Sequence, residues 1–264
     1  MTSITPAPEL QSTPDGRPPM RSRAWLWVLL ALIVLGGAVA LAVWLLPTST
    51  ATQNETFDGE VDQLVIDVTG GVNLVAGDQT ELTITKEWLF AGEPSAEVTY
   101  ENGVARVEGP CFWFQINCTT SVSGTVASDA VIQVRTYAGS IDVSGTTSVV
   151  DLETSAGSVN ADDVTGPARL VTSPGNITGS LADGAVEAET SLGLIDLTVL
   201  GEFNSLSAST SAGNVELTVP DEVYDVDADT SAGSVNVSER TDPSAGRHIF
   251  AESSAGSITI SPAP

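Results

Sequence analysis

The second half of the chain alternates apolar and polar residues in a pattern that repeats seven times. In each copy, apolar residues stand seven and five positions before a glycine and two and mostly four positions after it. Successive side chains of a β-strand point to opposite faces, so each copy predicts two short strands with one buried face. The glycine predicts a corner, because it adopts backbone conformations that other residues rarely reach. The seven glycines are Gly139, Gly157, Gly175, Gly193, Gly213, Gly233 and Gly256.

The spacing of these glycines indicates the architecture. Consecutive glycines are 18 to 23 residues apart, and a short fixed period is typical of stacked coils rather than of one globular core. We therefore predict an all-β fold, a single-stranded β-solenoid of 18–23-residue coils over residues 131–264, in which equivalent side chains of neighbouring coils lie directly over one another. The alternative is a β-sandwich or β-propeller with evenly spaced strands.

A hydroxyl residue stands three positions before every corner glycine. It continues the phase of the buried positions, so its side chain is expected to point inward near the corner. A hydroxyl there needs a hydrogen-bond partner, which the neighbouring coil or the backbone of the turn can supply. These residues are Thr136, Thr154, Thr172, Thr190, Thr210, Thr230 and Ser253.

Residues 61–130 carry a weaker form of the same pattern. The segment 61–75 alternates in the same way, with Gly70 at the expected corner. Further on, two alternating runs flank Glu101-Asn102-Gly103, which predicts a β-hairpin. We interpret residues 61–130 as degenerate first coils and a cap, continuous with the repeats.

Cys111 and Cys118 are the only cysteines and enclose the aromatic residues Phe112, Trp113 and Phe114. Outside the cytoplasm, two cysteines this close are expected to form a disulfide that fixes a tight loop. The aromatic residues have two interpretations. They are either the core of the cap or an exposed tip that contacts lipid or a partner.

An apolar segment near the N-terminus predicts a membrane anchor. Residues 24–46 contain no charged side chain, and this length crosses a bilayer as one transmembrane α-helix. Arginines precede the segment, so the N-terminus is expected in the cytoplasm and the C-terminal domain outside the cell membrane. We expect residues 1–23 to be a disordered cytoplasmic tail and residues 47–60 a stalk. The alternative is a cleaved signal peptide.

The charge of the chain narrows the choice of partners. The formal net charge is −25, and after residue 47 we count six basic residues against 32 acidic ones. Such a surface repels nucleic acid, so no nucleic-acid partner is expected. The acidic residues keep a sheet-rich domain soluble, or they attract basic peptides and weakly bind divalent cations.

A search for catalytic groups leads to no site. His248 is the single histidine, and its neighbours indicate a loop residue rather than a member of a triad or zinc site. The carboxylates Asp225, Asp227 and Asp229 cluster, and some glycan-cleaving enzymes use carboxylate pairs. No row of aromatic or basic residues accompanies them as a substrate site would require. We therefore expect no enzyme, no catalytic residues, no cofactor and no dedicated metal site.

The repeated phrase, as in TSAGSVNV at 230 and SSAGSITI at 253, resembles the bacterial "putative adhesin" β-strand-repeat family over roughly residues 60–260. The resemblance implies a β-solenoid on the outer side of a bacterial envelope, often behind a membrane span, and supplies no catalytic residues. It leads to the hypothesis of a membrane-anchored, adhesin-like binding or scaffold module with an envelope or surface ligand of unknown identity. The alternatives are an envelope-stress sensor that passes a binding signal across the membrane and, third, a glycan-cleaving enzyme.

Overall fold

The computed structural model describes residues 28–30, 32–35, 37, 48–57, 59–89, 92–111, 115 and 117–263. Residues from Thr48 onward form one compact all-β unit, which confirms the predicted fold class. The predicted tail 1–23 and most of the predicted span 24–46 lie outside the described residues. Within that span the described residues are helical. Among all described residues, no helix has both the length and the apolar character needed to cross a bilayer.

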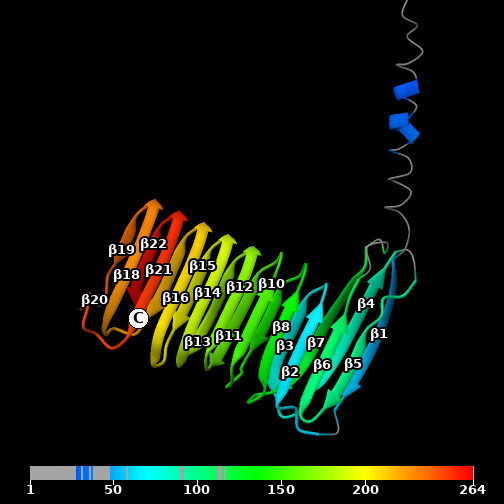
Figure 1. The fold of residues 1–264 in the computed structure, drawn as a ribbon, viewed down its shortest axis with the longest axis horizontal. Helices are drawn as coiled ribbons and strands as arrows, with labels where there is room; N and C mark the ends of the chain where they lie inside the picture. Colours follow the sequence, from blue (N-terminus) through cyan, green and yellow to red (C-terminus); the bar gives the residue numbers. More distant parts are fainter. Residues whose placement is uncertain are drawn as a thin grey trace, which may run out of the picture. The chain divides into compact units, whose positions relative to one another are not determined.

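Two 11-stranded sheets make up the unit (Figure 1). Sheet A contains, in spatial order, β1 (Ser49–Thr56), β4 (Glu81–Trp88), β7 (Thr119–Ala127), β3 (Val72–Gly77), β9 (Ile141–Ser144), β11 (Val159–Thr165), β13 (Ile177–Ala182), β15 (Ile195–Val199), β17 (Val215–Val219), β22 (Ile258–Pro262) and β19 (Val235–Val237). Sheet B contains β20 (Arg240–Thr241), β18 (Val223–Ala232), β21 (His248–Ala255), β16 (Phe203–Ala212), β14 (Gly184–Leu192), β12 (Ala168–Pro174), β10 (Val150–Thr154), β8 (Val131–Thr136), β2 (Gln63–Val68), β6 (Val104–Gly109) and β5 (Glu97–Glu101).

Each repeat forms one coil, with a strand in sheet B, a glycine corner and a strand in sheet A. Neighbouring coils pair in parallel and in register, so that Val159 lies between Ile141 and Ile177. All three side chains are fully buried, as are the equivalent residues of sheet B, and together they form one continuous core between the sheets. The predicted alignment of equivalent side chains is therefore confirmed for these coils.

The hydroxyl residue of each repeat joins its coil to the next one at the corner. Thr172 Oγ1 donates a hydrogen bond to the carbonyl oxygen of Gly157 at 2.7 Å, and Thr154 Oγ1 donates to that of Gly139 at 3.0 Å. The same bond recurs in every copy, within 2.6 to 3.5 Å. The inward hydroxyl predicted from the sequence thus has its partner in the backbone of the neighbouring corner.

The spatial order of the coils departs from chain order at both ends. The last coil, β21 and β22, lies between the β16–β17 coil and the β18–β19 coil. The corner bonds follow the same order, because Ser253 Oγ donates to the Gly213 carbonyl and Thr230 Oγ1 to that of Gly256. Residues 238–247 give the chain enough length to return, whereas residues 220–222 connect β17 directly to β18. At the other end, β2 and β3 lie between the β6–β7 and β8–β9 coils.

Antiparallel strands cover the sheet A edge of the unit at the end where β7 lies. Strand β4 pairs with β7, and β1 pairs with β4 along its whole length. Residues 49–56, which we expected in a stalk, thus form an edge strand, since their threonines suit a strand and their polar side chains suit a sheet edge. Strands β5 and β6 form the predicted hairpin, with Asn102 and Gly103 at φ 53° and 79°.

At the opposite end, residues around β20 cover part of the core. The rings of Phe203 and Tyr224 stack with their centroids 5.4 Å apart, and both side chains are buried. Glu239 is only 8% exposed, and its Oε1 has no hydrogen-bond partner within the described chain. Burial, and then the charge of Asp221, raise the pKa of the Glu239 carboxyl, although Arg240 opposes the shift. The sequence predicted only a loop here, so this buried acid was missed.

The close contact between corner glycines of neighbouring coils leads to a first prediction, on Gly213. A Cβ at this position would collide with the carbonyl of Gly193, and the backbone has φ +155°. Gly213→Ala is expected to lower the free energy of unfolding by about 3 kcal/mol, because a rigid corner cannot move aside. Gly246→Ala is the control, since a Cβ there meets nothing within 4 Å, and it should change stability by less than about 0.5 kcal/mol. Urea unfolding compares the two, and equal stability of both variants would contradict a close-packed corner.

The second prediction concerns the pH dependence of stability. The pKa of Glu239 is higher in the folded state than in the unfolded chain. The buried carboxylate therefore lowers the free energy of unfolding once it is ionised. This loss is absent at low pH and grows as the pH rises from the unfolded-state pKa to the folded-state pKa. Glu239→Gln removes this loss, which is about 1.4 kcal/mol for each unit by which the pKa is raised. Thermal unfolding should show the variant more stable than the natural chain at pH 7, with the difference shrinking toward pH 3.5. A difference that stays constant with pH would contradict this assignment.

Candidate functional site

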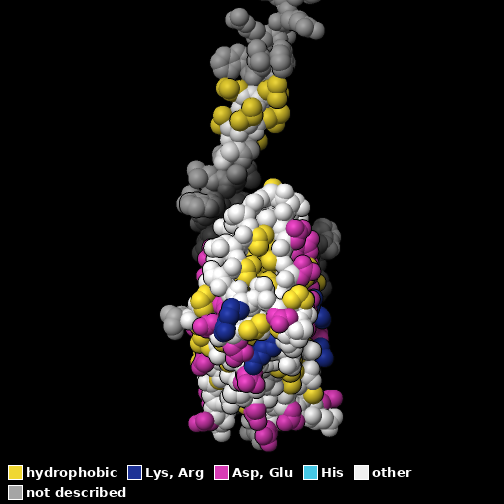
Figure 2. Space-filling model, turned by 90° about the vertical axis from the view of Figure 1, so that its left-hand side faces the viewer, with side chains coloured by type: hydrophobic (Ala, Val, Ile, Leu, Met, Phe, Trp, Pro, Cys, Tyr) yellow, Lys and Arg dark blue, Asp and Glu magenta, His cyan; other side chains and the backbone are white. Residues whose placement is uncertain are grey.

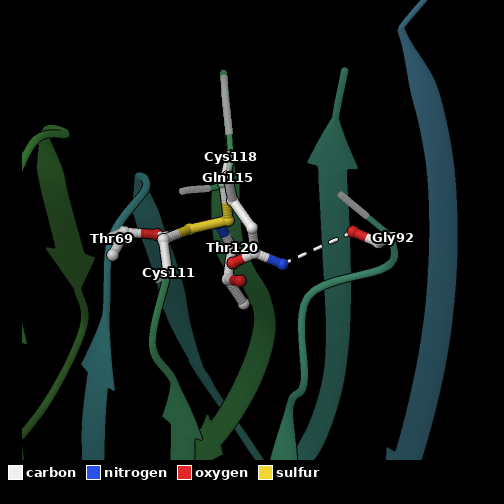
Figure 3. Close-up of a disulfide and its surroundings, with 6 residues drawn as sticks. All are labelled: Thr69, Gly92, Cys111, Gln115, Cys118 and Thr120. Atoms are coloured by element: carbon white, nitrogen blue, oxygen red, sulfur yellow. Dashed lines mark hydrogen bonds between the residues drawn. A yellow bond between two sulfur atoms is a disulfide. The ribbon is translucent and has the colours of Figure 1, made fainter. Parts of the chain in front are cut away.

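The predicted disulfide closes an enlarged corner of the coil formed by β6 and β7. Cys111 and Cys118 are bonded, with their Cα atoms 5.9 Å apart, which confirms the pairing (Figure 3). Thr69 Oγ1 lies 3.2 Å from the sulfur of Cys111 and accepts a hydrogen bond from the backbone N–H of Thr120 at 3.1 Å. In this coil the disulfide loop takes the place of the short glycine corner between the two strands.

One side chain of the disulfide loop bonds to a neighbouring segment of the chain. Gln115 Nε2 donates to the carbonyl of Gly92 at 3.4 Å, so one loop side chain reaches the segment between β4 and β5 (Figure 3). Phe112, Trp113 and Phe114 lie outside the described residues. Both interpretations of these aromatic residues, cap core and exposed tip, therefore stay predictions.

A shallow hollow lies on the outer face of sheet B, across strands β8 to β16. Its volume is about 500 Å³. Small or apolar side chains form part of its lining, among them Val149, Pro167 and Ala185. The polar groups come mainly from the row of equivalent residues that lies two positions further along each strand. We call this feature the sheet B hollow, and its polar lining includes Gln133, Asp151, Arg169, Glu187, Ser205 and Ser207.

Arg169 is the central charged group of the sheet B hollow. Its Nη1 lies 3.1 Å from Asp151 Oδ1 on one neighbouring strand, and its Nε lies 3.7 Å from Glu187 Oε2 on the other. Burial by itself would lower the pKa of Arg169, but the hydrogen bond to Asp151 and the surrounding carboxylates raise it overall. The guanidinium therefore stays charged, and it lies between two acids of the neighbouring strands.

Register explains why the sequence analysis missed this group. Gln133, Asp151, Arg169 and Glu187 each stand six positions before a corner glycine, so stacking brings them into one row. The signal is present in the repeat pattern, as an alternation of charge over three successive copies, Asp151, Arg169 and Glu187, at one position of the repeat.

The outer face of sheet A has a different character. Its rows carry hydroxyl, amide and carboxylate groups, which bond to one another along the ladder. Thr178 Oγ1 donates to Asn160 Oδ1 at 3.1 Å, and Ser180 Oγ donates to Asp162. Neighbouring coils thus satisfy some of the polar groups on this face.

The carboxylates considered for catalysis lie on the terminal strand β18. Asp225, Asp227 and Asp229 alternate along its outer face, and Asp225 Oδ2 lies 3.2 Å from His248 Nδ1. His248 begins strand β21, which corrects its interpretation as a loop residue. Within the part of the chain that the structure describes, no three His, Cys, Asp or Glu side chains come together in a way that could hold a metal ion.

The corner glycines, finally, lie in one continuous row. Each approaches the glycine backbone of the coil next to it, and Gly70 extends the row toward β7, as its position in the pattern suggested. In spatial order the row runs through Gly70, Gly139, Gly157, Gly175, Gly193, Gly213, Gly256 and Gly233. This row has a structural role and brings no reactive side chain to the surface.

Three solved structures illustrate what the chain is similar to. A "putative cell adhesion protein" from Clostridium sporogenes has 10% sequence identity and a TM-score of 0.39, covering 81% of this chain and all of its own. A "putative adhesin" from Bacteroides fragilis has 11% identity and a TM-score of 0.33, covering 81% of this chain and 97% of its own. Another "putative adhesin", from Parabacteroides merdae, has 14% identity and a TM-score of 0.27, covering 82% and 97%.

No curated protein matches the chain at a significant level. The family comparison gives a clear result, because the Toastrack DUF4097 family matches residues 110–261, which is more than half of the sequence. This stretch contains all seven corner glycines and the hydroxyl residues that bond them. The resemblance inferred from the repeated phrase is thereby confirmed, and the chain belongs to the Toastrack DUF4097 family.

Proposed function

We propose that the chain is a non-enzymatic, adhesin-like binding module of the bacterial envelope, and that its ligand occupies the sheet B hollow. The observation that carries this proposal is the combination of an apolar floor with a fixed row of charged and amide groups. Binding sites for small ligands commonly pair an apolar surface with a few well-placed polar groups that set orientation.

The chemistry of the hollow fits a glycan better than a peptide. A sugar ring offers C–H groups to an apolar floor such as Val149 and Pro167, and hydroxyl groups at its edge. Those hydroxyls both donate and accept, so they suit a row in which Asp151 and Glu187 accept while Arg169 donates. Neighbouring coils repeat at about 4.8 Å, which lets a polymer with repeated sugar units contact several of them at once.

The proposed location is the outer side of the cell membrane. The disulfide between Cys111 and Cys118 supports an oxidising compartment, since disulfides persist outside the cytoplasm. In this proposal residues 24–46 anchor the chain and residues 1–23 lie in the cytoplasm. A role in envelope-stress sensing stays a prediction from the sequence resemblance.

The third prediction tests the hollow with full-length chain in detergent micelles. Isolated cell-wall glycan fragments should sediment the protein, and Arg169→Gln should lower the bound fraction about five- to tenfold. At low saturation this corresponds to about 1 to 1.4 kcal/mol, slightly less than the roughly 1.5 to 3 kcal/mol of a typical hydrogen bond to a charged group, because Arg169 is partly exposed to water. The same samples should release no soluble sugar, as expected for a binding module.

Arg135→Gln is the matched control. Arg135 lies on the same face of sheet B and pairs with Glu153 at 3.3 Å. It is not among the described residues that line the hollow, so this variant removes one positive charge without changing the site. It should retain wall fragments as well as the natural chain. Equal losses in both variants, or no retention of the natural chain, would argue against a site in the hollow.

A further inference from the structure

The β18–β19 coil leaves part of the core uncovered at its outer side. Val226 and Ala228 align with Ile249 and Ala251 of the neighbouring coil, which are fully buried. Val226 and Ala228 themselves are only partly buried, and Val235 on β19 is 42% exposed. Residues at positions that are buried in the inner coils thus reach the surface at this end.

The backbone of this coil is also open. Strand β20 pairs only with Val223 and Tyr224, and β19 is the last strand of sheet A. The N–H of Asp225 points toward β21 and donates to the carbonyl of Arg247, the residue before that strand. Since successive peptide groups of a strand point to opposite sides, the N–H and C=O groups of Val226 and Ala228 face the free edge.

The opposite end of the unit shows how the same fold covers such an edge. There the chain supplies antiparallel strands of its own to both sheets, β5 beside β6 in sheet B and β4 beside β7 in sheet A. Leu82 and Ile84 of β4 are buried against the core. Polar residues alternate with them on the outer face of the strand. A strand of alternating inward apolar and outward polar residues is therefore the element that completes an open coil of this fold.

The charges at the open end determine which strand fits. Asp225, Asp227 and Asp229 occupy the outward positions of β18. Figure 2 looks onto this end and shows hydrophobic side chains in its middle, Asp and Glu to either side, and a few Lys or Arg side chains among them. The arginines here, Arg240 and Arg247, already pair with Asp221, Glu202 and Glu222, so they leave the three aspartates of β18 available. In a two-fold pairing of β18 with a second copy, these aspartates would oppose one another, which is destabilising. Lysine or arginine at the same cross-strand positions is attracted instead.

We propose that the free edge of β18 binds an antiparallel β-strand of a basic partner protein, in which apolar residues alternate with lysine or arginine. The apolar residues cover Val226 and Ala228, and the basic residues lie beside the three aspartates. The partner's backbone completes the hydrogen bonds of the edge, as in other cases of strand addition to a sheet. This surface is separate from the sheet B hollow and does not depend on a ligand there.

The test uses full-length chain and a fluorescently labelled ten-residue peptide that alternates valine and lysine. A peptide of the same composition, with five valines followed by five lysines, controls for non-specific attraction to an acidic protein. Fluorescence anisotropy should give at least about tenfold tighter binding of the alternating peptide. Hydrogen exchange should show that it slows the amides of Val226 and Ala228.

Two substitutions locate the binding surface. Asp227→Lys should weaken binding of the alternating peptide at least about tenfold, whereas Asp196→Lys, at an exposed site on β15 in the middle of sheet A, should weaken both peptides only slightly. Arg169→Gln should leave peptide binding unchanged, which separates this proposal from the glycan proposal. Equal binding of the two peptides, no binding of either, or self-association through β18 would overturn it.

Discussion

The rest of the structure depends on one interaction, the hydrogen bond from a corner hydroxyl to the glycine carbonyl of the neighbouring coil. This bond needs a buried Thr or Ser, a glycine without a side chain in the way, and an exact register between coils. In the copy at Thr172 the residue is 2% exposed, and its hydroxyl donates to the carbonyl oxygen of Gly157. Each such bond contributes only about 1 kcal/mol, but a shifted register would leave a hydroxyl unpaired in every copy, and in six of the seven copies that residue is buried. The ladder therefore selects one alignment of the sheets.

Because the same corner serves every pair of neighbouring coils, coils can join in an order that differs from chain order. The terminal coils use this freedom at both ends, and the consequence at one end is an open β18 beside a buried Glu239. The outer faces follow from register as well. Each row takes its chemistry from one position of the repeat, so a single position supplies Asp151, Arg169 and Glu187 to the sheet B hollow. Both proposed binding surfaces are thus produced by the rows and the ends of the solenoid.

Much of the regular part of this fold could be predicted from the sequence, because alternation and period are local signals. The buried rows through Val159 and the inward threonines follow from spacing, and the hairpin at Asn102 follows from its Asn-Gly turn between two alternating runs. The order of the terminal coils could not be predicted, since every corner is compatible with every other. The row around Arg169 required a comparison of charges across copies, and Glu239 lies in an insertion that has no counterpart in the other repeats.

Cross-linking across the last three coils tests the ladder and its order most directly. Ser207, Phe250 and Asp227 occupy one outward row, in which Phe250 lies between the other two. With cysteines at 207 and 250, mild oxidation should give a disulfide that mass spectrometry can map, because adjacent strands are about 4.8 Å apart. Cysteines at 207 and 227 are roughly 10 Å apart in this arrangement and should not cross-link. A disulfide between 207 and 227, with none between 207 and 250, would show that the coils follow chain order and would contradict this account.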